Sequence, residues 1–145
     1  MTLHLVKLCV GAESVADLRD WIAERGDQQL ADGRVPEHAH TTRMVPKRRD
    51  DILDGGSLYW VIKGAVQVRQ RILDLRPFKG SDGIGRCDIV LDRDLVETVR
   101  QPRRPFQGWR YLEPKDAPRD VAAVASEGDE LPPALRAELA ELGLL

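Results

Sequence analysis

The strongest constraint on the fold is the density of β-forming residues in the run GSLYWVIKGAVQVRQRIL, residues 56–73. This run has an apolar arm at residues 58–62, a Lys63-Gly64 turn and a second arm that follows it. β-branched and aromatic residues favour strands, and a short Gly-containing turn between two such arms is typical of a β-hairpin. In the second arm apolar and cationic residues alternate, and the alternation slips, which predicts a bulge near Gln70.

The N-terminal part of the chain predicts one strand and one helix. Residues 3–10 form a largely apolar run, which indicates a strand covered on both faces. Apolar residues then recur at helical spacing after Ser14, a good N-cap residue, and we expect this helix to end near Gly26. Residues 27–40 are polar and show no periodicity, so they predict a loop.

Short elements with clear breaks between them follow. We expect a strand at residues 41–45, a short helix at residues 46–53, a Gly-rich turn at residues 77–85 and strands at residues 86–91 and 95–99.

Prolines shape the C-terminal third of the chain. Pro102 and Pro105 exclude residues 103–112 from a central strand, so this segment predicts a loop or an edge strand. Pro114 begins a short helical turn, and Pro133 opens a helix with leucines on one stripe.

Together these elements predict an α+β fold. Short strands joined by hairpin-like turns favour a small, mostly antiparallel sheet or barrel, flanked by an N-terminal and a C-terminal helix. We expect one domain at residues 1–125 and a C-terminal helical extension at residues 126–145.

The composition is that of an ordinary globular protein, with 42% apolar and 32% charged residues. No apolar run approaches the ~20 residues of a membrane-spanning helix, and the N-terminus lacks a signal segment. These features predict a cytoplasmic protein that does not contact membranes. Cys9 and Cys87 lie in apolar runs, which predicts two reduced thiols.

Charge is distributed unevenly along the chain. Residues 34–110 hold 16 Lys and Arg against 10 Asp and Glu, whereas the formal net charge of the whole chain is −2. A basic middle between acidic ends suggests a face that binds anions.

Two groups of residues are candidates for that face. Cationic side chains on a rigid sheet can contact phosphates, and a loop that mixes arginines with aromatic residues can contact phosphates and stack on unpaired bases. The same side chains could instead form a solvated sheet face and a loop packed over the core. The candidate residues are Arg43, Lys63, Arg69, Arg71, Arg103, Arg104, Phe106, Trp109 and Arg110.

No motif of high specificity identifies a metal site or a catalytic mechanism. His38 and His40 lack the paired spacing that zinc sites usually show, and Ser57 lacks a recognisable triad context. We therefore predict neither a metal nor a cofactor, and the sequence leaves open whether the protein is an enzyme.

The chain resembles a known but uncharacterised family. The opening MTLHLVKLCVG, the run GGSLYWVIKGAVQVRQRIL and the run RRPFQGWRYL with the Asp-Ala-Pro-Arg that follows it are similar to a bacterial domain-of-unknown-function family, number 1489. The resemblance covers nearly the whole chain and supplies no catalytic residues.

A second resemblance concerns the fold alone. A Gly-containing turn between two apolar arms with interposed cations is similar to the pseudouridine-synthase-and-archaeosine-transglycosylase (PUA) barrels and the activating-signal-cointegrator (ASCH) domains. Such domains bind RNA or modified bases, which implies a base-binding role for Lys63 and Arg69. The order of glycine and lysine in the turn departs from the family pattern, because Lys63 precedes Gly64 instead of following a glycine.

Three functions follow as hypotheses. The first is a non-catalytic binding module for RNA or another phosphate-bearing anion, which uses the basic face and the Arg/aromatic loop. The second is an enzyme that acts on a nucleotide-like or phosphorylated small molecule. The third is an interaction or assembly protein, such as a homodimer, that uses the C-terminal helix.

Overall fold

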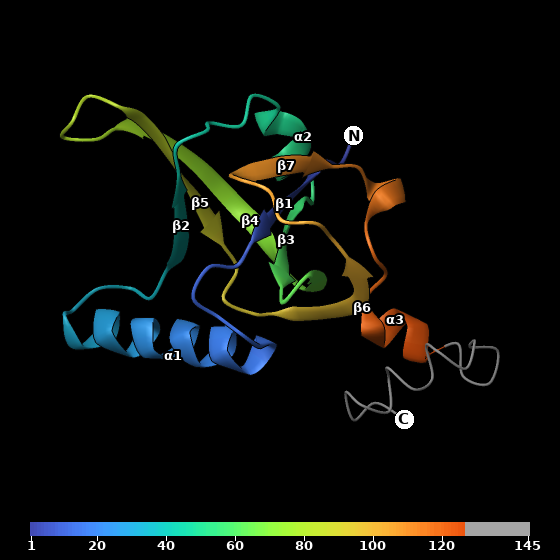
Figure 1. The fold of residues 1–145 in the computed structure, drawn as a ribbon. Coiled ribbons are helices and arrows are strands. Elements are labelled where there is room, and N and C mark those ends of the chain that lie inside the picture. The colour runs from blue at the N-terminus through green and yellow to red at the C-terminus, as the bar shows by residue number, and fades with distance from the viewer. Residues whose placement is uncertain (127–145) are drawn as a thin grey trace.

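The structure, a computed structural model, describes residues 1–126 and shows an α+β fold (Figure 1). The C-terminal extension predicted at residues 126–145 lies outside the described residues, apart from Ser126. The helical elements are α1 (Val15–Ala31), α2 (Arg49–Leu53), the 3-10 turn η1 (Pro114–Asp116) and α3 (Val121–Ala125). The strands are β1 (His4–Leu8), β2 (His38–Thr42), β3 (Ser57–Ile62), β4 (Ala65–Lys79), β5 (Gly85–Leu91), β6 (Val96–Pro102) and β7 (Trp109–Leu112).

The strands form one mixed, mostly antiparallel sheet. Its order is β2-β5-β4-β3-β1-β7, and β6 pairs with β4. β4 is 15 residues long, so that its first half pairs with β3 and β6 and its second half with β5. The one parallel pair in the described sheet joins β1 to β3, which are connected through α1, β2 and α2. Figure 1 shows α1 and α2 at opposite ends of the sheet and the β4–β5 hairpin projecting beyond it.

The prediction of a mostly antiparallel sheet is confirmed, and its barrel alternative does not hold, because β2 and β7, the two ends of the strand order, do not pair with each other. Side chains of β7 instead reach the segment that follows β2. Trp109 Nε1 donates to the Met44 carbonyl at 2.7 Å, and the Lys47 amide donates to the Tyr111 hydroxyl at 3.0 Å. The sheet is therefore curved, and hydrogen bonds link β7 to the segment after β2, but the sheet remains open.

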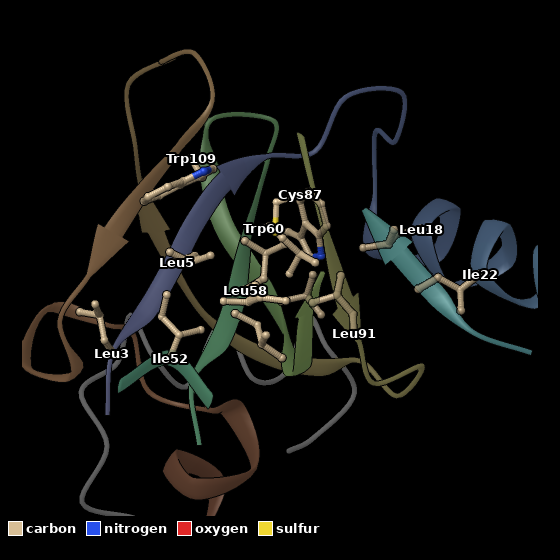
Figure 2. Close-up of a cluster of buried hydrophobic side chains, with 14 of the residues drawn as sticks. Leu3, Leu5, Leu18, Ile22, Ile52, Leu58, Trp60, Cys87, Leu91 and Trp109 are labelled. Atoms are coloured by element: carbon tan, nitrogen blue, oxygen red, sulfur yellow. The ribbon is translucent and has the colours of Figure 1, made fainter. Parts of the chain in front are cut away.

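Apolar side chains cover both faces of the central strands. In β1, Leu5 belongs to a large cluster on one face and Val6 to a smaller cluster on the other. This confirms the expectation that the first strand is covered on both faces. The large cluster includes Trp60 from β3 and two residues of α1, Leu18 and Ile22 (Figure 2).

The hairpin predicted within residues 56–73 is confirmed, with β3 and β4 as its arms. Lys63 and Gly64 have φ values of 50° and 80°, so both residues of the turn are left-handed, as in the tight turns that suit a hairpin. The pairing of β4 shifts between Val66 and Val68 and again between Ile72 and Asp74, whereas the sequence predicted one bulge near Gln70.

Several predicted boundaries are wrong. α1 continues past Gly26 to Ala31, and β2 occupies part of the predicted loop at residues 27–40. The segment 103–112 ends in β7, which is an edge strand, and the short turn predicted at Pro114 is present as η1.

Candidate functional site

Arg69 is placed on the sheet as the alternation predicted, but its charge is neutralised. Its guanidinium donates to both carboxylate oxygens of Asp120, at 2.8 and 2.7 Å, and to the Ser57 hydroxyl at 2.9 Å. Asp120 belongs to the segment 113–126, which we call the C-terminal strap. Only about a quarter of each side chain of the pair is exposed, 24% and 29%. The hydrogen bonds from Arg69 to Asp120 raise the pKa of this arginine above its usual value. An external phosphate would have to displace Asp120.

The surroundings of Arg69 are polar and partly enclosed. The Ser57 amide donates to Nδ1 of His4 at 3.0 Å, and the His4 ring meets Tyr59 edge to face. Burial, followed by the nearby Arg69 charge, lowers the pKa of His4, so that this histidine is neutral at pH 7. These contacts attach the strap to the sheet, and they leave Arg69 with little capacity for a ligand.

The other sheet cations are exposed and spread out. Arg71 lies on the same face as Arg69, and its side chain makes no ion pair within residues 1–126. Arg43 is exposed after the end of β2. Lys63 lies in the β3–β4 turn with its Nζ 4.0 Å from Glu13, and both of these side chains are largely exposed. The sheet does not gather these cations into one patch.

Trp109 is a core residue and cannot stack on a ligand. Its side chain is 6% exposed, lies in the large cluster with Leu5 and donates its indole N–H to Met44 (Figure 2). Phe106 is half-buried against the smaller cluster, with the Arg110 guanidinium 5.3 Å from its ring centroid. The packing interpretation of these two aromatic residues is therefore the one that the structure supports.

Among the arginines of the same segment, Arg104 and Arg110 are exposed to solvent and Arg103 is half-buried. Arg103 and Arg104 line an open depression of about 610 Å³ together with Gln101 and Tyr111; we call it the arginine hollow. Arg103 donates to Gln101 Oε1 at 3.4 Å, and Arg110 donates to two backbone carbonyls. Within residues 1–126, none of these three arginines forms an ion pair.

Two carboxylates also line the arginine hollow. They belong to Glu113 and Asp116. The Glu113 carboxylate lies 3.5 Å from the Lys115 ammonium group, so part of its charge is neutralised. Lys63 joins this region through the backbone, because the Arg103 amide donates to the Gly64 carbonyl at 2.9 Å. The structure thus brings Arg103 and Arg104 together at one hollow, with the Lys63-Gly64 turn bonded to the backbone of Arg103 and with Arg110 in the adjoining strand β7. Arg69 lines a different depression, beside His4 and Asp120.

A buried polar network that the sequence did not reveal lies on the other face of the sheet. Gln70 accepts from the Trp60 indole at 2.8 Å, donates to the Asp92 carbonyl at 2.8 Å and meets Nδ1 of His38 at 2.9 Å. Its only signal in the sequence was a polar residue within the densest β run, at a position in phase with Val68 and Ile72.

The histidines do not form a metal site with other residues of the described chain. No group of three or more His, Cys, Asp or Glu side chains in residues 1–126 has the geometry to hold a metal ion. Burial, the largest cause, lowers the pKa of both His38 and His40 to about 4. Burial also raises the pKa of Cys9 to about 11, so that this thiol stays protonated at pH 7.

The model of one protein family, described as "Protein of unknown function (DUF1489)", matches residues 5–145. The chain belongs to this family. No curated protein and no solved structure matches the chain. Membership of DUF1489 confirms the first resemblance and assigns no activity, while the likeness to PUA and ASCH barrels stays a prediction. Within residues 1–126, no helix has both the length and the apolar character required to cross a bilayer.

Proposed function

We propose that the protein is a non-catalytic binding module for RNA or another phosphate-bearing polyanion, which it contacts through the arginine hollow. The observation that carries this proposal is a group of three arginines that form no ion pair within residues 1–126: Arg103 and Arg104 line the hollow, and Arg110 is exposed in the adjoining strand β7. Guanidinium groups bind phosphate through paired N–H donors, and their charge drives the release of counterions from a nucleic acid.

The backbone around the hollow supports a fixed arrangement of these charges. Arg103 is anchored by its amide to Gly64, and Arg110 follows directly after Trp109, whose ring is held in the core. Phe106 packs on the smaller cluster between them. A loop fixed at three points presents its arginines with little loss of conformational entropy on binding.

No observation favours the enzyme hypothesis over this one. The hypothesis requires an enclosed pocket in which Arg69, Arg71 or Arg110 lies beside a carboxylate with a shifted pKa. Asp74 does have a lowered pKa, but the cause is its exposed pair with Arg49. The assembly hypothesis depends on the C-terminal helix, which lies outside the described residues.

The test is binding of a fluorescently labelled single-stranded RNA at low salt, measured by anisotropy. The double variant R103Q/R104Q removes two charges from the hollow and should weaken binding at least roughly fivefold. The matched control R34Q/K79Q removes two cations elsewhere, one beside Asp32 and one at the end of β4 in the β4–β5 hairpin, and should leave affinity near that of the wild type. Equal losses in the two variants, or no binding by the wild type, would contradict the proposal.

A further inference from the structure

Of the three tryptophans, Trp21 is the one whose indole is available to a ligand. Trp60 and Trp109 are 3% and 6% exposed, and their indole N–H groups donate to Gln70 and to the Met44 carbonyl. Trp21 is 44% exposed. Its indole N–H has no acceptor within residues 1–126. An exposed indole is therefore present on α1, whereas the exposed aromatic ring of β7 is the phenol of Tyr111.

The fold holds the Trp21 ring in one orientation. Its neighbours on α1, Leu18 and Ile22, are buried in the large cluster. The ring meets the buried His38 edge to face, with centroids 6.0 Å apart, and the Arg25 guanidinium lies 4.6 Å from its centroid. A ring fixed in this way loses little side-chain entropy when a ligand stacks on it.

A hollow beside the ring has room for a planar group. It has a volume of about 320 Å³ and lies between the end of β1 and the first turns of α1. Cys9, Val10 and Ala12 give it a largely apolar wall, and Asp17 lies at its rim. We call it the tryptophan hollow. An apolar wall next to an indole suits an aromatic ring such as a nucleobase, because every base has a face that can stack.

The Lys63-Gly64 turn contacts segments that lead to both hollows. Glu13, in the loop that begins α1, lies 4.0 Å from Lys63, and the next residue of that turn, Gly64, accepts the amide of Arg103. The loops before α1, after β3 and after β6 thus meet at the same end of the sheet. Asp17, Asp20, Glu24 and Asp27 make α1 itself unfavourable for phosphates, so the backbone of a bound strand is expected to follow Lys63 and the arginines.

From this arrangement we propose that Trp21 stacks on an unpaired base of a single-stranded RNA whose phosphates occupy the arginine hollow. The inference rests on the proposed function and narrows its ligand class from a polyanion in general to one that carries bases. A peptide or a polyphosphate would fit only one of the two hollows. A peptide lacks a regular phosphate backbone, and a polyphosphate lacks aromatic groups.

The direct test is tryptophan fluorescence of the wild-type protein during titration with a short single-stranded RNA and, separately, with inorganic polyphosphate of matched charge. Stacking quenches an indole, and the other two indoles are buried, so RNA should quench the emission and polyphosphate should not. Quenching of the same size by polyphosphate, or bound RNA without quenching, would overturn the inference.

Variants separate this inference from the proposed function. Trp21→Leu should weaken RNA binding roughly 5- to 100-fold without affecting polyphosphate, and Trp21→Phe should restore most of the affinity. Phe78→Leu is the matched control, because Phe78 is 42% exposed on the β4–β5 hairpin, away from both hollows.

If Trp21→Leu and Phe78→Leu bind RNA equally well while R103Q/R104Q binds it weakly, the base-stacking inference is wrong and the proposed function stands. If the wild type binds neither RNA nor polyphosphate, the proposed function fails and the inference fails with it. Thermal melting without ligand shows whether each variant is folded. The quenching experiment uses the wild type, so it tests the inference even if a variant does not fold.

Discussion

At the scale of single residues, the hydrogen bonds of Gln70 fix the protonation state of His38. The Gln70 side-chain oxygen accepts from Trp60, so its NH₂ group faces Nδ1 of His38 as a donor. Nδ1 must then accept, which requires a neutral imidazole. Burial, followed by the charges of Arg25 and Arg93, lowers the pKa of His38 to about 4. Protonation would place two donors against each other in the core.

His40 is also neutral, but no hydrogen bond from the described part of the chain holds its Nε2. Its Nε2 is buried and has no hydrogen-bond partner within residues 1–126, and its ring lies edge to face on Trp60, with centroids 5.3 Å apart. Burial, then the charges of Lys7, His38 and Arg25, lowers its pKa to about 4, against the opposite effect of Asp88.

These two histidines predict a loss of stability in mild acid. In the unfolded chain a histidine has a pKa near 6.5, so between pH 6.5 and 4 the unfolded state binds more protons than the folded state. The free energy of unfolding is therefore highest above pH 6.5 and falls as the pH approaches 4. We expect each histidine to contribute about 2 kcal/mol to this fall, allowing for partial solvent screening. Urea unfolding at pH 7 and pH 5 measures it.

The matched variant is His40→Phe. It keeps an aromatic ring against Trp60 and removes a buried, unpartnered nitrogen, so stability at pH 7 should be equal or higher and the dependence on pH smaller. A variant with the pH dependence of the wild type would show that His40 is not among the groups responsible.

The residue patterns could not predict that Trp109 is buried and that Trp21 is exposed. Spacing placed Trp21 with Leu18 and Ile22 on an apolar stripe. The buried stripe of α1 runs through Leu18, Ile22 and Gly26, and this narrow contact leaves Trp21 at its edge. Trp109 lies in a charged, proline-flanked loop sequence, and only its long-range contact with Met44 places it in the core.

At the scale of elements, periodicity predicted most strands, and the errors have local causes. Gly26 looked like the end of α1, but it is buried, and a Cβ there would overlap the Arg93 guanidinium. The glycine lets the Arg93 side chain, from the segment after β5, lie close to the helix, and it does not end the helix. The strand predicted at residues 41–45 lies three residues too far along the chain, because the sequence HAHTT of β2 lacks alternation, although β5 pairs with all five of its residues.

The pair between Arg69 and Asp120 is expected to hold the C-terminal strap on the sheet. Asp120→Ala would leave a partly buried guanidinium without its carboxylate, so we expect a loss of about 2 kcal/mol in the free energy of unfolding. Urea unfolding of the chain 1–145 at pH 7 gives the value.

The double variant Arg69→Met, Asp120→Leu is the control for this prediction. It replaces the pair by apolar side chains, and it should regain part of the lost stability, because no charge is left unpaired. Single and double variants of equal stability would mean that the pair contributes nothing specific.

At the scale of the whole molecule, two properties depended on contacts that are remote in sequence. Nothing in the local patterns indicated that β1 pairs in parallel with β3, or that a curved sheet would be tied at Met44 and Trp109 without closing. The α+β class and the mostly antiparallel pairing, by contrast, followed from short strands and tight turns. Local pattern determined the elements, and long-range packing determined their arrangement.

Folding also neutralises part of the positive charge in residues 34–110. Five arginines of this region form ion pairs with carboxylates at distances of 2.7–3.0 Å, which reduces their availability to a ligand: Arg48, Arg49, Arg69, Arg76 and Arg86. Arg103, Arg104 and Arg110 form no ion pair within residues 1–126, and Lys63 has only its 4.0 Å contact with the exposed Glu13.

The number of cations that contact phosphates sets the dependence of binding on salt. If Lys63, Arg103, Arg104 and Arg110 each neutralise one phosphate of a single strand, the slope of log affinity against log salt is about −3, since each contact contributes about −0.7. R103Q/R104Q should reduce its magnitude to about half of that, by loss of two contacts. Arg69→Gln should leave the slope unchanged, because Asp120 already neutralises that charge. A wild-type slope near zero, or a change of slope in Arg69→Gln as large as in R103Q/R104Q, would mean that phosphates are not bound where the unpaired arginines lie.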